Sequence, residues 1–208
     1  MKEDEAAFQE LRRLDAKDML ASVVAAARRY LAKHPARGLG WFLYSESLRR
    51  QARYSEALQA LRRASRLCPA SKMHLVYIRR ATLHRQRGAI RVAERWFRRA
   101  ADSLPQDASY HILLGGLLAS SGRLQEAEAV HRRATRCKEG CIDEAWLNLG
   151  LVLRARERFR EARTCFRRAI ALDPKYRDAW RALADVEYAI GESGRARVRD
   201  RRRNGKPR

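Results

Sequence analysis

The chain has 208 residues, 46% of them apolar, and a formal net charge of +22. This apolar content excludes a wholly disordered chain, and the longest apolar run, 112–119, is far shorter than the roughly 18 residues that a transmembrane helix needs. The acidic start, Met-Lys-Glu-Asp-Glu, is unlike a secretory signal, so we expect a cytoplasmic protein whose cysteines are reduced.

The positive charge admits two interpretations. Arginine supplies 39 of the 46 basic residues, and a basic surface can bind nucleic acid or an acidic protein surface. The same excess of arginine is typical of solvated helix faces encoded by a GC-rich genome. Because the charge is spread along the chain, we favour the second interpretation.

Residues 1–37 are expected to form a divergent first pair of helices. Pro35 lies 34 residues before Pro69 and would end the second helix, because proline cannot continue the hydrogen-bond ladder. The large ring that opens the later repeats is missing here, as is common in the end units of repeat proteins. Apolar residues recur at helical spacing, namely Phe8, Leu11 and Leu14, then Leu20, Val23, Val24, Ala27 and Leu31.

Four repeats with one shared residue pattern follow, at 38–72, 73–107, 108–142 and 143–176. Each opens with a ring, has a small residue four positions later, an alanine 16 positions after the ring, and a second alanine seven positions further. The first alanines are 36, 34 and 35 residues apart, so the pattern is an internal repeat. The rings are Trp41, Tyr77, His111 and Trp146, the first alanines are Ala57, Ala93, Ala127 and Ala162, and the bulky residues between the alanines are Leu61, Phe97, His131 and Phe166.

The spacing within a repeat predicts two amphipathic helices joined by a short turn. Between residues 143 and 174 apolar side chains fall at i, i+3 and i+4, first around Trp146 and again around Phe166. Glycine stands in the turn of two repeats and is replaced in the other two. The turn residues are Ala52, Gly88, Gly122 and Glu157.

The fourth repeat carries the fullest version of a known motif. Residues 146–150 read Trp-Leu-Asn-Leu-Gly, and residues 166–174 read Phe-Arg-Arg-Ala-Ile-Ala-Leu-Asp-Pro. This resembles the tetratricopeptide repeat family, whose unit of about 34 residues carries W-x-x-L-G-x-x-Y, then A-x-x-x-F, A and P. The resemblance implies an all-α fold, a right-handed α-solenoid or superhelix of stacked antiparallel helix pairs.

The last part of the chain is expected to close the array. A fifth opening ring, Trp180, predicts a capping helix over 177–193. Residues 194–208 are rich in arginine and hold few apolar residues. We therefore expect this basic tail to be disordered.

The resemblance also implies where a partner would bind. In this family the first helices of the pairs line a concave groove, and the residue after each opening ring faces it. These residues are Phe42, Ile78, Ile112, Leu147 and Arg181, and the next row is Arg49, Arg85, Ala119 and Arg154. Apolar anchors beside guanidinium groups would suit a protein or peptide partner with apolar and acidic side chains. The alternative is that the apolar residues pack against neighbouring helices.

A second basic feature supports an alternative function, the binding of RNA or DNA. Paired arginines recur at one position of each second helix and are expected to point away from the core, where phosphates could follow them together with the basic tail. No aromatic side chains alternate with them to stack bases, so we favour a solvated surface. The pairs are Arg62 and Arg63, Arg98 and Arg99, Arg132 and Arg133, and Arg167 and Arg168.

Catalysis, a cofactor and a metal ion are not indicated by the sequence. No motif of the common catalytic types occurs. Cys137 and Cys141, even with His131, would leave a tetrahedral metal site one ligand short. We therefore predict a non-catalytic protein-interaction scaffold or adaptor without cofactor, metal or membrane segment.

Overall fold

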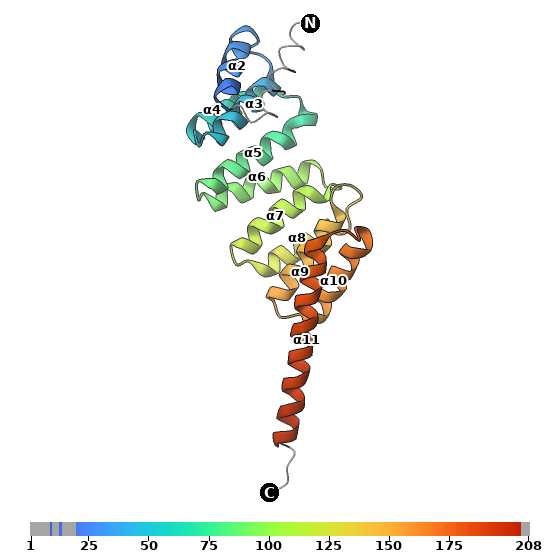
Figure 1. Cartoon of the computed structure of the whole chain (residues 1–208). Helices are drawn as coiled ribbons and strands as arrows, with labels where there is room; N and C mark the ends of the chain where they lie inside the picture. Colours follow the sequence, from blue (N-terminus) through green and yellow to red (C-terminus); the bar gives the residue numbers. More distant parts are fainter. Residues whose placement is uncertain (1–8, 10–12, 14–19, 205–208) are drawn as a thin grey trace. The chain divides into compact units, whose positions relative to one another are not determined.

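The computed structural model describes the backbone of residues 9, 13 and 20–204 and the side chains of residues 9, 13 and 22–192. In this part of the chain all regular structure is helical (Figure 1), which confirms the all-α fold class. The α-helices are α2 (Leu20–Lys33), α3 (Gly38–Arg50), α4 (Tyr54–Leu67), α5 (Met73–Gln86), α6 (Ile90–Ser103), α7 (Ala108–Ser120), α8 (Leu124–Ala134), α9 (Ile142–Ala155), α10 (Phe159–Leu172) and α11 (Arg177–Asn204), with a short 3₁₀ helix at Ala70–Lys72.

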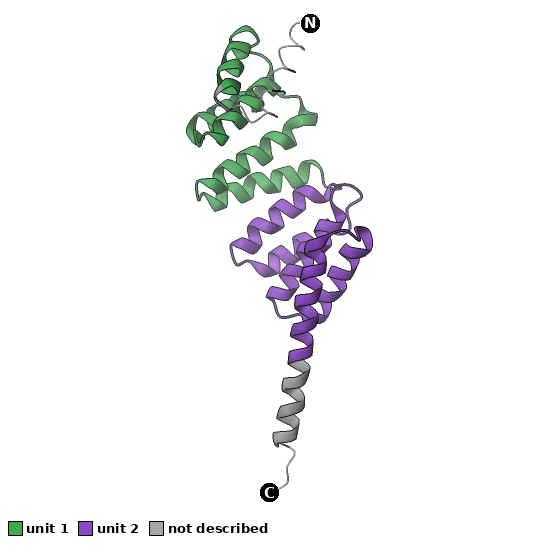
Figure 2. Ribbon diagram, in the orientation of Figure 1, with its two compact units in different colours: residues 1–104 green, residues 105–208 purple. Residues whose placement is uncertain are grey.

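The chain divides into two compact units, Met1–Leu104 and Pro105–Arg208 (Figure 2). Unit 1 contains α2 and the helix pairs α3/α4 and α5/α6. Unit 2 contains the pairs α7/α8 and α9/α10, followed by α11. Helix α2 matches the predicted second helix of the divergent first pair, whereas Phe8, Leu11 and Leu14 of its predicted first helix lie outside the described residues.

The two helices of each pair are joined by the same backbone turn. The turn residue is left-handed in all four pairs, with φ of 57° at Ala52, 74° at Gly88, 76° at Gly122 and 60° at Glu157. The next N–H donates to a carbonyl five residues earlier, which closes a Schellman motif. These bonds run from Arg53 to Leu48, Ala89 to His84, Arg123 to Leu118, and Arg158 to Leu153, at 2.9, 2.8, 3.0 and 2.9 Å. The two non-glycine residues adopt this conformation at a cost of about 1 kcal/mol each.

Small residues let the two helices of a pair approach closely. A Cβ atom added to Gly150 would lie 2.4 Å from the ring of Phe166, and one added to Gly115 would lie 2.5 Å from the ring of His131. The eight alanines of the repeat pattern have no exposed surface. They are Ala57, Ala64, Ala93, Ala100, Ala127, Ala134, Ala162 and Ala169.

The repeat that lacks the proline departs from the others. Its second helix, α8, has 11 residues, whereas α4, α6 and α10 have 14 each. The loop after α8 is tied to the start of the repeat, since Ala108 donates its N–H to the carbonyl of Glu139 at 2.9 Å. The side chain of Asp107 caps α7 by accepting from the N–H of Ser109 at 2.9 Å. In this repeat, which lacks the proline, backbone hydrogen bonds thus hold the loop that follows the second helix.

Helix α11 begins where the capping helix is expected but continues to Asn204. This differs from the disordered tail predicted from residue 194 on. Residues 195–204 hold neither proline nor glycine, and arginine is a strong helix former, so nothing interrupts the helix before Gly205. Among the described residues no second helix follows α11, and Trp180 and Tyr188 are 52% and 72% exposed.

Candidate functional site

In unit 1 the first helices α3 and α5 form a surface that combines apolar and charged side chains, which we call the first-helix surface. Phe42 on α3 and Ile78 on α5 are partly buried. The carboxylate of Glu46 accepts hydrogen bonds from Arg49 at 2.7 and 2.9 Å and forms an ion pair with Arg79 at 2.7 Å. The guanidinium of Arg79 also lies 5.6 Å from the ring centroid of Phe42. Two guanidinium groups therefore share the carboxylate of Glu46.

In unit 2 the equivalent apolar residues do not face solvent, contrary to the prediction. Ile112 and Leu147 are only 8% and 6% exposed. Ile112 lies in one core cluster with Ala145, and Leu147 lies in another with Ala182. These alanines come from the next first helix and leave room for the larger side chain. The alternative interpretation, packing against neighbouring helices, therefore applies to both residues.

The remaining predicted groove positions have separate environments. Arg154 of α9 donates to Asp185 of α11 at 2.9 Å, and the pair links the two helices. Arg181 is exposed and lies 3.6 Å from Asp178. Arg85 is exposed at the end of α5, and Ala119 is partly buried.

The paired arginines of the second helices are all exposed, as predicted. Several are neutralised by carboxylates of their own unit. Arg98 pairs with Glu94 at 2.7 Å, and Arg167 pairs with Glu187 at 2.9 Å. Arg132 pairs with Glu128.

Aromatic rings lie beside two of these arginines in unit 1, which the sequence analysis did not expect. The guanidinium carbon of Arg63 is 4.6 Å from the ring centroid of Trp41, and that of Arg99 is 4.8 Å from the ring of Trp96. Trp96 directly precedes Phe97 in the sequence. The repeat pattern includes the buried Phe97 but not Trp96, so it gave no signal for this ring.

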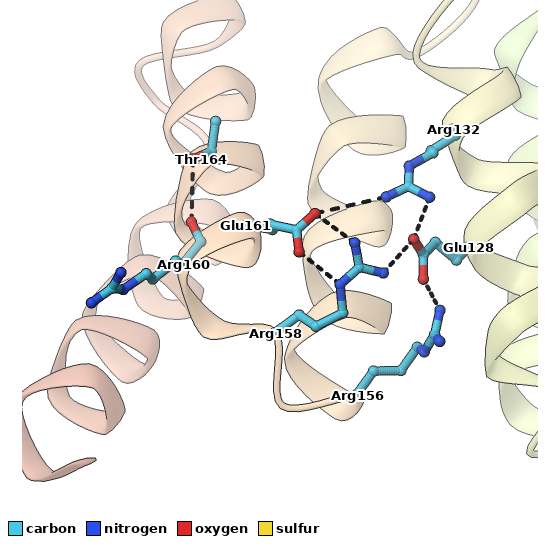
Figure 3. A network of polar contacts seen from close by, with 7 residues as sticks. All are labelled: Glu128, Arg132, Arg156, Arg158, Arg160, Glu161 and Thr164. Atoms are coloured by element: carbon cyan, nitrogen blue, oxygen red, sulfur yellow. Dashed lines mark hydrogen bonds and ion pairs between the residues drawn. The ribbon is translucent and has the colours of Figure 1, made fainter. Parts of the chain in front are cut away.

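An ion-pair network in unit 2 was also missed by the sequence analysis (Figure 3). Glu128 on α8 is 2% exposed and pairs with Arg132 of the same helix. It also accepts from Arg156 and, at 2.7 Å, from Arg158, both in the turn between α9 and α10. Arg158 in turn donates to Glu161 at 2.5 and 2.7 Å, which lowers the pKa of that carboxyl. Both oxygens of Glu128 are occupied, so the network joins the two repeats and offers no open site.

The buried His131 and the cysteines have no catalytic arrangement in the part of the chain that the structure describes. Burial lowers the pKa of His131 to about 4, so the imidazole is neutral near pH 7. The four cysteines are free, and burial raises the pKa of Cys165 to about 11, which disfavours the nucleophilic thiolate. No group of three or more histidine, cysteine or acidic side chains among the described residues could hold a metal ion.

Unit 1 also contains an open pocket of about 450 Å³ between α2, α3 and α4. Its walls include Trp41 and Tyr44 and the charged side chains of Arg28, Glu56 and Arg63. Arg28 donates to the hydroxyl of Tyr44 at 2.8 Å and lies 3.6 Å from Glu56. Of the helices described, none has the length and apolar character needed to cross a membrane.

Comparison with sequence families supports the repeat pattern directly. Models described as tetratricopeptide repeat match residues 24–72, 78–140 and 143–176, which together span more than half of the chain. No curated protein sequence matches it.

Solved structures of repeat proteins share the fold. The C-terminal part of a TPR repeat-containing protein from Cytophaga hutchinsonii is 14% identical with a TM-score of 0.75, and the match covers 89% of this chain and 72% of that one. A tetratricopeptide repeat protein from Parabacteroides merdae is 19% identical with a TM-score of 0.68, covering 95% and 77%. YrrB, described as a TPR protein with an unusual peptide-binding site, is 18% identical with a TM-score of 0.62, covering 85% and 89%. At these identities the likeness shows the fold alone.

Proposed function

Since the chain belongs to the tetratricopeptide repeat family, we propose that it is a non-catalytic scaffold or adaptor that binds a segment of a partner protein. The fold by itself does not specify a function, so the proposal depends on the surface. Family members bind peptides or partner helices along their first helices, and the structurally similar YrrB is described as having a peptide-binding site.

The observation that carries the proposal is the first-helix surface of unit 1. Phe42 and Ile78 keep part of their apolar surface exposed there, while Ile112 and Leu147 of unit 2 are buried. The two positive charges of Arg49 and Arg79 surround the single negative charge of Glu46. A partner segment with an apolar anchor next to an acidic side chain would complement both properties.

The test is capture of a partner from native lysate by the full chain, after nuclease treatment and at moderate salt. Ile78→Glu places a charge at the proposed apolar contact and should abolish retention of a stoichiometric protein. Ile90→Glu is the matched control, because Ile90 is 36% exposed in the same unit but begins α6, a second helix. It should retain the partner.

Retention of the same proteins by both variants would exclude the first-helix surface as the binding site. Recovery of mainly nucleic acid that is lost on nuclease treatment would contradict the scaffold function. Circular dichroism of both variants should show unchanged helicity, because neither side chain is fully buried.

A further inference from the structure

Arg80 occupies a position that is apolar in the other described repeats. It follows the opening ring Tyr77 by three residues on α5. The residues at this position elsewhere are Tyr44, Leu114, Leu149 and Leu183, which are between 4% and 9% exposed. A guanidinium in a position built for the core is costly unless its charge is compensated.

The surroundings of Arg80 hold its guanidinium between aromatic and basic side chains. Its guanidinium carbon lies 3.9 Å from the ring centroid of Trp96 on α6, and that of Arg99 lies 4.8 Å from the same ring. Tyr77 stacks on Trp96 with the ring centroids 5.7 Å apart. Stacking covers the face of a guanidinium and leaves its N–H edge directed outward, in the geometry that binds oxyanions.

No carboxylate of the described residues pairs with Arg80 or Arg99, or with Arg62 of α4, whose charge acts on Arg80. Arg98, which precedes Arg99, pairs instead with Glu94 at 2.7 Å. The Nε atom of Arg80 is buried and has no hydrogen-bond acceptor in this part of the chain. Burial and the charges of Arg62 and Arg99 lower the pKa of Arg80, so three positive charges act on one region without an acid to balance them.

We propose that this arginine–tryptophan cluster, Arg62, Arg80, Trp96 and Arg99, binds a phosphate monoester on a side chain of a partner protein. A phosphate monoester brings close to two negative charges and three acceptor oxygens, which suits three guanidinium groups better than the single charge of a carboxylate or a phosphodiester.

The cluster lies apart from the first-helix surface of unit 1. Arg62, Trp96 and Arg99 belong to the second helices α4 and α6. Arg80 shares α5 with Ile78 and Arg79, but its guanidinium lies over Trp96 of α6, whereas that of Arg79 lies over Phe42 of α3. The inference rests on the proposed scaffold function in one respect, namely that the phosphate is carried by a partner protein. The two sites can therefore be tested separately.

The probe is a short peptide of glycine and alanine with one central phosphoserine, titrated calorimetrically into the full chain at about 0.15 M salt, where long-range attraction is screened. Arg80→Leu and Arg99→Gln should each weaken binding by about tenfold or more, because each removes a charge-assisted hydrogen-bond donor. Arg98→Gln removes the same charge from the neighbouring position and should leave the affinity within about twofold of the parent.

Arg80→Leu installs the residue found at Leu114 and Leu149, so it is expected to fold, and thermal unfolding should show no loss of stability. If Arg80→Leu is nevertheless destabilised, Arg99→Gln on the exposed surface decides the matter. Unchanged phosphopeptide affinity in Arg99→Gln would overturn the proposal, since the cluster would then be a structural stack.

Two further results would also overturn it. If Arg98→Gln weakened phosphopeptide binding as much as Arg99→Gln does, general attraction by the net charge would explain the binding. Equal affinity for a peptide with glutamate in place of phosphoserine, or for a single-stranded oligonucleotide without a terminal phosphate, would assign the cluster to carboxylates or to nucleic acid. Ile78→Glu should bind the phosphopeptide as the parent does. Failure of the phosphate proposal would therefore not contradict the proposed partner binding at the first-helix surface.

Discussion

Two titratable side chains on α8, Glu128 and His131, are buried within one turn of each other and are accommodated in opposite ways. His131 is 1% exposed and its Nδ1 atom has no partner in the described residues, so it is held neutral. Glu128 is 2% exposed and is surrounded by arginines that compensate its charge. An imidazole can shed its charge near neutral pH at little cost, whereas the carboxylate of Glu128 is compensated by its ion pairs with arginines.

The neutral His131 makes stability depend on pH. The pKa of this imidazole is 6.5 when unfolded and about 4 when folded. Between these values the unfolded chain binds more protons than the folded chain, so the free energy of unfolding falls as the pH drops from 6.5 to 4, by about 3 kcal/mol from this group. His131→Phe, which copies Phe166 beneath Gly150, should lose this part of the pH dependence in urea unfolding. An unchanged pH profile would contradict the assignment.

Removing the charge of Glu128 should weaken unit 2. Glu128→Gln leaves the partly buried Arg156 without its carboxylate and removes one of the two carboxylate partners of Arg132 and Arg158, and it is expected to cost about 2 kcal/mol of unfolding free energy. Glu126→Gln, two residues earlier on α8, breaks an exposed pair with Arg123 and should cost less than about 0.5 kcal/mol. Thermal or urea unfolding of both variants measures the difference, and equal losses would show that burial of Glu128 has no special effect.

At the scale of the element, the crossing of two helices in a pair is set by one small residue. Gly115 of α7 faces the ring of His131, and Gly150 of α9 faces the ring of Phe166. The neighbouring Gly116 is exposed, and a Cβ atom there would meet nothing within 4 Å. Two consecutive glycines therefore have different roles, one in packing and one without a contact.

Alanine substitution at these two glycines should change stability in opposite directions. Gly115→Ala forces its Cβ atom against His131 and should cost about 1 to 3 kcal/mol. Gly116→Ala removes glycine from the middle of a helix without a clash and should add about 0.5 to 1 kcal/mol. Chemical unfolding followed by circular dichroism measures both, and a stabilising Gly115→Ala would mean that α7 and α8 can separate at little cost.

At the scale of the whole molecule, electrostatic repulsion is not removed by ion pairing. With 46 basic and 24 acidic residues, 22 basic side chains would stay unbalanced even if every carboxylate paired with a different cation. In the described part of the chain, ion pairs such as that of Arg154 with Asp185 join side chains within a repeat or in adjacent repeats. Folding brings the unpaired charges closer together than they are in the unfolded chain.

Salt should therefore stabilise this protein. Raising sodium chloride from about 20 mM to about 300 mM shortens the Debye length severalfold and is expected to raise the free energy of unfolding by about 1 kcal/mol. Urea is the suitable denaturant because guanidinium is itself a salt. Potassium chloride at equal ionic strength should act alike. A decrease in stability with salt would show that the local ion pairs outweigh the net repulsion.

The repeat pattern predicted the fold closely because its residues act within one helix pair. The spacing of Ala57 and Ala64 or of Gly150 and Phe166 fixes which helix faces meet, and all of these residues are buried as expected. The site was predicted less well. Whether Ile112 is exposed depends on Ala145 in the next repeat, a contact that the pattern of a single repeat does not contain.

The sequence by itself determined the helix pairs, their turns and the family, since periodicity and small residues encode local packing. Only the tertiary structure decided which charged groups are compensated. Arg98 and Arg99 are adjacent and identical in the sequence, yet one pairs with Glu94 and the other lies over Trp96 beside Arg80. That difference arises because successive residues of a helix point about 100° apart, so the two side chains lie on different faces of α6, one beside Glu94 and the other over Trp96.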